Sequence, residues 1–124
     1  MILSFQPQFV EKALNGSKLN TIRENKGDRF VKGTKIHFYK GNPRNVSTNP
    51  YQFGVGVVSE ILPIQILPTQ NKVLLAGLPV IDLEAFARAD GFTSWAAMKL
   101  FFPNDFEGSI IFWERCGPVN SKQI

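Results

Sequence analysis

The sequence predicts an α+β domain in which helices flank a small curved sheet or a partial β-barrel. The expected elements come in the order strand, helix, strands, helix pair and strand. Most strand candidates are short and interrupted by bends, and there are only three helix candidates, a balance typical of such sheets. Because the helices do not alternate with the strands, a regular parallel βαβ sheet fits this order less well.

Composition indicates one soluble globular domain. The chain has 124 residues, of which 44% are hydrophobic and 12% aromatic, enough for a core without disulfide support. Cys116 is the only cysteine, which fits a reducing compartment, and we expect a cytoplasmic protein. No apolar stretch is long enough to span a membrane. We expect residues 1–116 to form the domain and residues 117–124 to form a flexible tail.

The N-terminal segment predicts a strand followed by a helix. Residues 1–5 lack the basic start and small-residue cleavage site of a signal peptide, so we interpret them as a first strand. Residues 6–16 have helical spacing, with Pro7 suited to the first turn and Gly16 suited to the end. A helix over this range would end directly before a basic polar segment.

The middle of the chain contains the main strand candidates. Residues 34–40 alternate between apolar and polar, and residues 51–67 form the longest strand candidate. In the longer one, two glycines share a face on which a large side chain packs or the strand bends. Pro63 predicts a bend or bulge in the same strand. Residues 71–77 predict one more short strand.

Two helices and a closing strand follow. Residues 82–91 predict a helix that Asp82 caps and Gly91 closes. Residues 93–102 predict a second helix, which ends before a proline, and residues 108–116 predict the last strand.

Charge is concentrated in the first third of the chain. Residues 1–44 contain nine Lys or Arg and three acids, a net charge of +6, whereas the whole chain carries +4. A basic region of this kind indicates an anionic partner, of which nucleic acid is the commonest, although the lysines also serve solubility.

One carboxylate falls on the apolar face of the helix at 82–91. Leu83, Phe86 and Ala87 define the inward stripe, and Asp90 is the next position on it. A buried carboxylate needs a cationic or hydrogen-bonding partner. Either Asp90 caps the helix that follows, or it meets the basic segment at residues 18–23, and periodicity does not choose between these two arrangements.

Two stretches together resemble the ASCH domain family. The stretch GSKLNTIR is similar to its G-x-K-x-x-T-x-R motif, with the fixed positions filled by Gly16, Lys18, Thr21 and Arg23. The later stretches FARADGFTSWAAMKLFF and FEGSIIFWE resemble the second half of many ASCH domains, a helix, a D-G-F turn, a second helix and a strand. The resemblance extends over residues 5–114, nearly the whole chain.

The resemblance implies a fold related to PUA domains, a β-barrel flanked by helices, with a cleft for RNA or modified nucleosides. Similar small bacterial proteins are amidohydrolases that remove the acetyl group from N4-acetylcytidine with a lysine, a threonine and an acid. These positions correspond to Lys18, Thr21 and Asp90, where aspartate replaces a glutamate that is one methylene longer. Other ASCH proteins are ribonucleases or RNA-binding modules, so a non-catalytic RNA-binding role is the alternative.

Amide hydrolysis requires a nucleophile, a proton shuttle and stabilisation of an oxyanion. Thr21 is the candidate nucleophile. Lys18 would act as its base if burial lowers its pKa, but would act as a charged donor if it stays protonated near the helix end. Asp90 would position a water or hold the exocyclic amine of a cytosine-like base. Arg23 would anchor substrate or structure, because guanidinium keeps its proton.

Three further residues are candidates for binding. Glu60 is the second choice for the acid, and Tyr39 or Phe92 would either stack on a base or pack against the protein. The sequence contains no Cys/His cluster with metal-ligand spacing and no glycine-rich phosphate loop, so we expect neither a metal nor a cofactor. The expected partner is a nucleoside or RNA.

Overall fold

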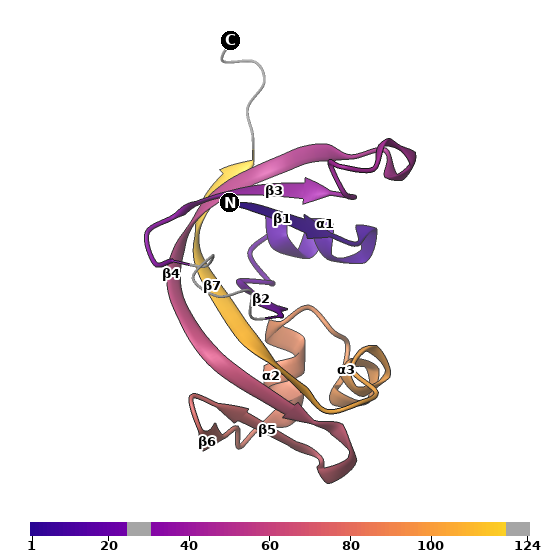
Figure 1. Cartoon of the computed structure of the whole chain (residues 1–124), viewed down its shortest axis with the longest axis vertical. Helices are drawn as coiled ribbons and strands as arrows, with labels where there is room; N and C mark the ends of the chain where they lie inside the picture. Colours follow the sequence, from indigo (N-terminus) through magenta and orange to yellow (C-terminus); the bar gives the residue numbers. More distant parts are fainter. Residues whose placement is uncertain (25–30, 119–124) are drawn as a thin grey trace.

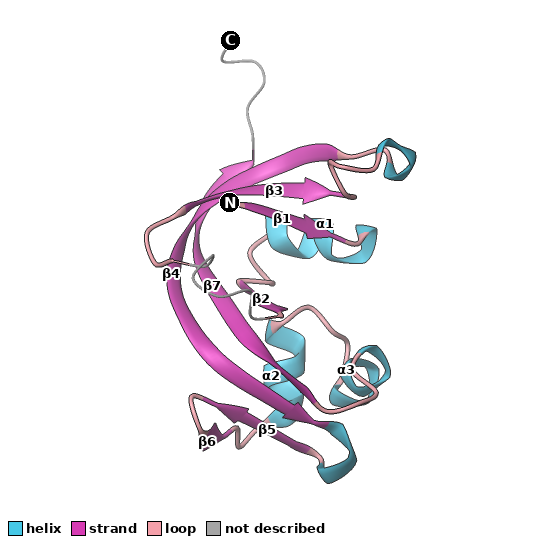
Figure 2. Cartoon of the chain, viewed as in Figure 1, coloured by secondary structure: helices cyan, strands magenta, loops and turns pink. Residues whose placement is uncertain are grey.

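The computed structural model describes residues 1–24 and 31–118 and has a mixed seven-stranded sheet with three α-helices (Figure 1). The α+β class is therefore confirmed. The sheet is strongly curved, and its described strands do not close into a barrel (Figure 2). The strands are β1 (Ile2–Phe5), β2 (Asn20–Arg23), β3 (Lys35–Lys40), β4 (Tyr51–Leu67), β5 (Lys72–Leu75), β6 (Leu78–Pro79) and β7 (Phe106–Pro118). The helices are α1 (Pro7–Leu14), α2 (Leu83–Ala89) and α3 (Trp95–Phe101).

The long strand β4 organises the sheet. Its first half pairs with β3 and its second half with β5, both antiparallel, while β7 pairs along most of its other edge. β1 joins β3 in parallel, β2 joins β7, and β6 joins β5. Figure 1 shows the resulting arc, with β1, β3 and α1 at one end and α2, α3, β5 and β6 at the other.

The predicted bulge at Pro63 is wrong. β4 runs through Pro63 in register with Ser109 of β7, and the register shifts lie earlier in the strand, at residues 54–56 and 58–60. The proline is tolerated because its missing N–H faces the end of β5, where the Ala76 N–H still donates to the Pro63 carbonyl at 2.9 Å.

An aromatic cluster fills the sheet end that carries β1 and β3, and we call it the aromatic core. Phe5, Phe38, Phe53 and Trp113 have ring centroids 4.9–6.0 Å apart, mostly edge to face. Gly56 of β4 makes room for it, since a Cβ there would lie 2.9 Å from Phe38 Cε2. Of the two arrangements predicted for the glycine face, packing against a large side chain is therefore found at Gly56.

The helix ends follow local sequence signals. Asp82 caps α2 by accepting the Ala85 N–H, and Ser94 caps α3 by accepting the Ala97 N–H. None of the helices within residues 1–24 and 31–118 is long and apolar enough to cross a membrane. β7 extends to Pro118, past the predicted start of the flexible tail, and residues 119–124 lie outside the described chain.

Candidate active site

Lys18 enters the site from the segment between α1 and β2. Gly16, with φ of 85°, ends α1, and the Lys18 N–H then bonds back to the Lys12 carbonyl at 2.9 Å. This turn directs the Lys18 side chain into the protein, where only 2% of the residue is exposed. Its Nζ lies 4.9 Å from the centre of the Phe9 ring, a cation–π contact.

Asp90 at the end of α2 is the partner of Lys18. The Lys18 Nζ donates to Asp90 Oδ1 at 3.2 Å and also to the Asp90 carbonyl oxygen, across 72 positions of sequence. Only 3% of Asp90 is exposed. Because Ser94 caps the following helix, the local capping arrangement for Asp90 is wrong, and the carboxylate instead meets the basic segment.

Thr21 and Arg23 come from β2, two residues apart and therefore on one face of the strand. The Arg23 Nε donates to Thr21 Oγ1 at 3.2 Å, and Arg23 Nη2 donates to the Ser4 carbonyl at 2.8 Å. The guanidinium also lies over the Phe5 ring, 5.2 Å from its centre. Thr21 is buried. Arg23, which is anchored to Ser4 of β1, therefore holds the Thr21 hydroxyl oxygen in place.

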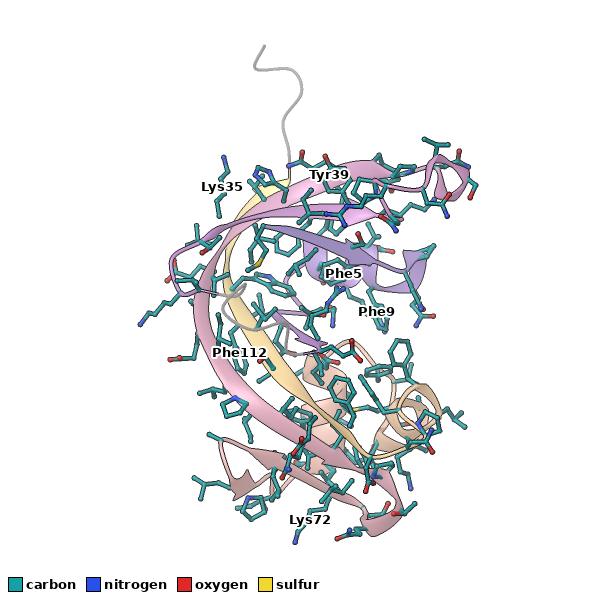
Figure 3. The ribbon with its side chains drawn as sticks, in the orientation of Figure 1. Phe5, Phe9, Lys35, Tyr39, Lys72 and Phe112 are labelled. Atoms are coloured by element: carbon teal, nitrogen blue, oxygen red, sulfur yellow. The ribbon has the colours of Figure 1, made fainter. Side chains whose placement is uncertain are left out.

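These four polar residues line one cavity of about 220 Å³, which we call the Lys18 cavity. Its other walls are mainly aromatic. Figure 3 shows Phe5 and Phe9 lying between the end of the arc that carries α1 and the end that carries α2 and α3. The cavity is lined by Ser4, Phe5, Gln6, Phe9, Lys18, Thr21, Ile22, Arg23, Asp90, Phe92, Phe101 and Phe102.

Burial shifts the protonation of both members of the ion pair toward neutrality. Burial lowers the pKa of Lys18, an effect that Asp90 opposes and that the charges of Arg23 and Lys12 reinforce. Burial also raises the pKa of Asp90 to about 6, against the attraction of Lys18 and Arg23. The pKa of Arg23 is lowered for the same reason. The lost hydration therefore outweighs the attraction between the two charges.

The other predicted residues are divided between the cavity and the rest of the surface. Phe92 lines the Lys18 cavity, whereas Tyr39 and Glu60 are not among its lining residues. Tyr39 is half-buried in β3 (Figure 3), and Glu60 is exposed on β4, where its Oε1 accepts the Ile61 N–H at 3.3 Å. The structure gives neither residue a position in this site.

Two residues hold the Asp90 turn: Lys12, whose contact no sequence signal predicted, and Gly91, which the sequence predicts only as the end of the helix. The Lys12 Nζ donates to the Gly91 carbonyl at 2.6 Å, so α1 is fixed to the end of α2. Gly91 has φ of 100°, and a Cβ there would lie 2.9 Å from Phe9 Cδ1 and 3.1 Å from Lys18 Cδ. The position of Gly91 directly after Asp90 was the sequence signal that could have indicated this close packing.

The described residues contain no group of three or more His, Cys, Asp and Glu side chains placed to hold a metal ion. Of the basic residues in the first third of the chain, Lys18 and Arg23 line the cavity, and Lys26 and Arg29 lie outside the described residues. The site therefore offers a hydroxyl, an amine, a guanidinium and a carboxyl group among aromatic rings.

Two solved structures have this arrangement of elements along nearly the whole chain. Both are crystal structures of single-residue variants of ZmASCH from Zymomonas mobilis. The first is 14% identical, with 98% of this chain and 76% of that chain covered and a TM-score of 0.59. The second is 15% identical, with 98% and 74% covered and a TM-score of 0.57. This chain has the ASCH fold.

The ASCH fold accounts for the position of the motif. Its lysine lies between α1 and β2, and its threonine and arginine lie on β2, which pairs with β7 beside the end of α2. No family model and no curated protein matches the sequence. At this level of identity the similarity establishes the fold, and the reaction has to be argued from the side chains.

Proposed function

We propose that this chain hydrolyses the amide bond of an N4-acylated cytidine such as N4-acetylcytidine. The observation that carries the proposal is the buried Lys18–Asp90 ion pair in one cavity with Thr21 and Arg23. Buried groups whose pKa values are shifted toward neutrality, inside a cleft, are typical of catalytic sites. The resemblance of the motif to acetylcytidine amidohydrolases supplies the substrate class.

In the proposed reaction, Thr21 Oγ attacks the acyl carbonyl carbon while Lys18 Nζ accepts the hydroxyl proton. The tetrahedral intermediate then breaks its C–N bond as Lys18 returns that proton to N4, which releases cytidine and leaves an acyl ester on Thr21. Water attacks this ester and gives a proton to Lys18. Finally, Thr21 Oγ leaves with the proton from Lys18, and the carboxylic acid departs.

Lys18 is suited to act as the base because burial disfavours its charged form. The Arg23 Nε–H occupies an acceptor position of Thr21 Oγ1, so the threonine's own hydrogen remains available for donation. The same guanidinium would stabilise negative charge on this oxygen as its proton leaves. Arg23 therefore supports the nucleophile without giving up a proton.

Recognition of the base would use the aromatic walls and the acid. The rings of Phe5, Phe9, Phe92, Phe101 and Phe102 line the cavity and provide surfaces on which a pyrimidine can stack. Asp90 would position the attacking water or accept a hydrogen bond from the exocyclic amine. Because Lys18 contacts Oδ1 of this carboxyl group, the other carboxyl oxygen would perform these tasks.

The test is to incubate purified protein with N4-acetylcytidine and to follow cytidine release by liquid chromatography. We expect turnover by the wild type and a loss of roughly a thousandfold or more in Thr21→Ala and Lys18→Ala. The control is Thr69→Ala, which makes the same change at an exposed threonine and should keep full activity. The absence of wild-type turnover, or equal turnover by the three variants, would refute the proposal.

The second candidate is a non-catalytic RNA-binding module, and the net charge of +6 in residues 1–44 favours it. It predicts micromolar or tighter RNA binding that weakens steeply with salt. Ribonuclease activity, a further alternative, would appear as shortened RNA on a denaturing gel in the presence of a metal chelator. Binding that is absent or independent of salt argues against both RNA roles.

A further inference from the structure

A groove lies directly beside the Lys18 cavity, between α1 and α3, and we call it the α1–α3 groove. Its volume is about 520 Å³, and it shares Gln6, Phe9, Phe92 and Phe101 with the cavity. Gln8, Thr93, Ala97 and Leu100 line the groove but not the cavity. A ligand seated in the cavity can therefore continue along α1 and α3 past the shared phenylalanines.

The groove combines exposed apolar surface with hydrogen-bonding groups. Phe101 is 45% exposed and Leu100 is 84% exposed, so flat apolar surface faces solvent along α3. Gln6, Gln8 and Thr93 add neutral donors and acceptors. Exposed aromatic surface on which a base can stack is typical of proteins that bind single-stranded nucleic acid.

The charge of the groove also suits an anionic ligand. Among the groove-lining residues, all within the described chain, Lys12 is the only charged one. Its Nζ donates one hydrogen to the Gly91 carbonyl at 2.6 Å, and an ammonium group has three, so two remain for a phosphate. No acid among the lining residues would repel a phosphate at this position.

We propose that the α1–α3 groove binds the nucleotide next to the modified cytidine, so that single-stranded RNA is a better substrate than the free nucleoside. This inference rests on the proposed function for its catalytic consequence. The acylated base enters the Lys18 cavity, the adjacent base stacks on Phe101 and Leu100, and the linking phosphate contacts Lys12. Sequence-independent stacking of this kind requires no base-specific hydrogen bonds.

The kinetic test compares free N4-acetylcytidine with an RNA trinucleotide that carries N4-acetylcytidine at its centre. We expect the wild-type kcat/KM to be about tenfold higher for the trinucleotide, the gain that stacking one additional base typically gives. Leu100→Glu should remove most of this preference and leave hydrolysis of the free nucleoside unchanged. The control is Leu78→Glu on β6, which introduces the same charge at a leucine that is 71% exposed and outside the groove.

The binding test uses an unmodified single-stranded RNA hexamer and fluorescence anisotropy, so it does not depend on turnover. Leu100→Glu should weaken binding about tenfold, Gln8→Lys should strengthen it, and Leu78→Glu should leave it unchanged. Both substituted groove residues are exposed, so circular dichroism should show folded proteins.

The outcomes separate the two proposals. If the wild type hydrolyses neither substrate, the proposed function fails. Binding of the RNA hexamer alone then tests whether the groove binds RNA. Equal kcat/KM for nucleoside and trinucleotide, or an RNA affinity that Leu100→Glu and Leu78→Glu change equally, overturns the groove proposal. Turnover of both substrates with a preference that only the groove variants alter supports both proposals.

Discussion

The aromatic core and the Lys18 cavity meet at Phe5 but bury different kinds of side chain. On one side of Phe5, the rings of Phe38, Phe53 and Trp113 lie 5.7–6.0 Å from its centre. On the other side, the Lys18 Nζ lies 5.8 Å away, and the Arg23 guanidinium lies 5.2 Å away. The first cluster is entirely aromatic, whereas the second places two basic side chains and a carboxyl group in the interior.

This difference separates a region whose burial stabilises the fold from one whose burial opposes it. Burying aromatic rings stabilises a fold directly, and edge-to-face packing adds to that effect. Burying an ion pair often gives no net stability, because the lost hydration equals or exceeds the attraction. Here burial lowers the pKa of Lys18 and raises that of Asp90, so it favours the neutral form of each group and the charged pair opposes folding. The proposed catalytic role would account for such a pair.

The largest expected change in stability comes from the aromatic core. Phe38→Ala removes a ring that contacts three other aromatic side chains, and we expect it to lower the free energy of unfolding by about 3–5 kcal/mol. Urea denaturation measures this change. Phe101→Ala is the matched control, and because that ring is partly exposed the loss should be smaller. Equal losses would contradict the assignment of this cluster as the core.

The second prediction breaks the ion pair on one side. Lys18→Met leaves Asp90 buried without its cation, which should lower the free energy of unfolding at pH 7 by about 3 kcal/mol. The double variant Lys18→Met/Asp90→Leu removes both charges. Its free energy of unfolding should recover most of this loss or exceed that of the wild type. Urea denaturation of the wild type, Lys18→Met, Asp90→Leu and the double variant gives the coupling energy between the two residues. A double variant less stable than either single variant would show that the pair stabilises the fold.

The third prediction concerns the titration of Asp90. Its pKa of about 6, above the ordinary 3.8, means that the folded state binds a proton more tightly than the unfolded state does. The stability from this group is therefore fully present below about pH 4 and is lost as the pH rises through about 6. The carbonyl ¹³C shift of the Asp90 side chain should have its midpoint near pH 6, and higher still in Lys18→Met. A midpoint below 4 would contradict this.

The smallest expected effect is that of Lys12. Its charge lowers the pKa of Lys18, so Lys12→Met should raise that pKa and move the acidic limb of the pH–rate profile to higher pH. Lys12→Arg keeps the charge and should restore the wild-type profile. The hydrolysis of N4-acetylcytidine between pH 5 and 9 measures the shift. An unchanged profile in Lys12→Met would show that this lysine only fixes the Gly91 turn.

Local signals in the sequence predicted the helices and strands and the inward position of Asp90. Gly16, Asp82 and Gly91 mark helix ends through their own conformational and capping preferences, so they can be identified without tertiary information. The inward position of Asp90 followed from helical periodicity in the same way. Its contact with Lys18, 72 positions away, could only be offered as one of two arrangements, since it depends on how α2 packs beside α1.

Two candidate binding residues lie outside the cavity, and an irregularity in the strand precedes each of them. Tyr39 follows a register shift after Phe38 in β3, and Glu60 follows another after Val58 in β4. A bulge changes which face of the sheet the next side chain occupies, and alternation in the sequence does not reveal it. The turn contact of Lys12 was missed because it joins two helices that are distant in the sequence.

We propose that the buried Lys18–Asp90 pair serves catalysis at the expense of stability. The most direct test is the rate of cytidine release from N4-acetylcytidine by Lys18→Met/Asp90→Leu, compared with the wild type at equal folded concentration. We predict that the wild type turns over and that the double variant, though at least as stable as either single variant, loses activity by roughly a thousandfold. A folded double variant as active as the wild type would show that the Lys18–Asp90 pair does not serve catalysis.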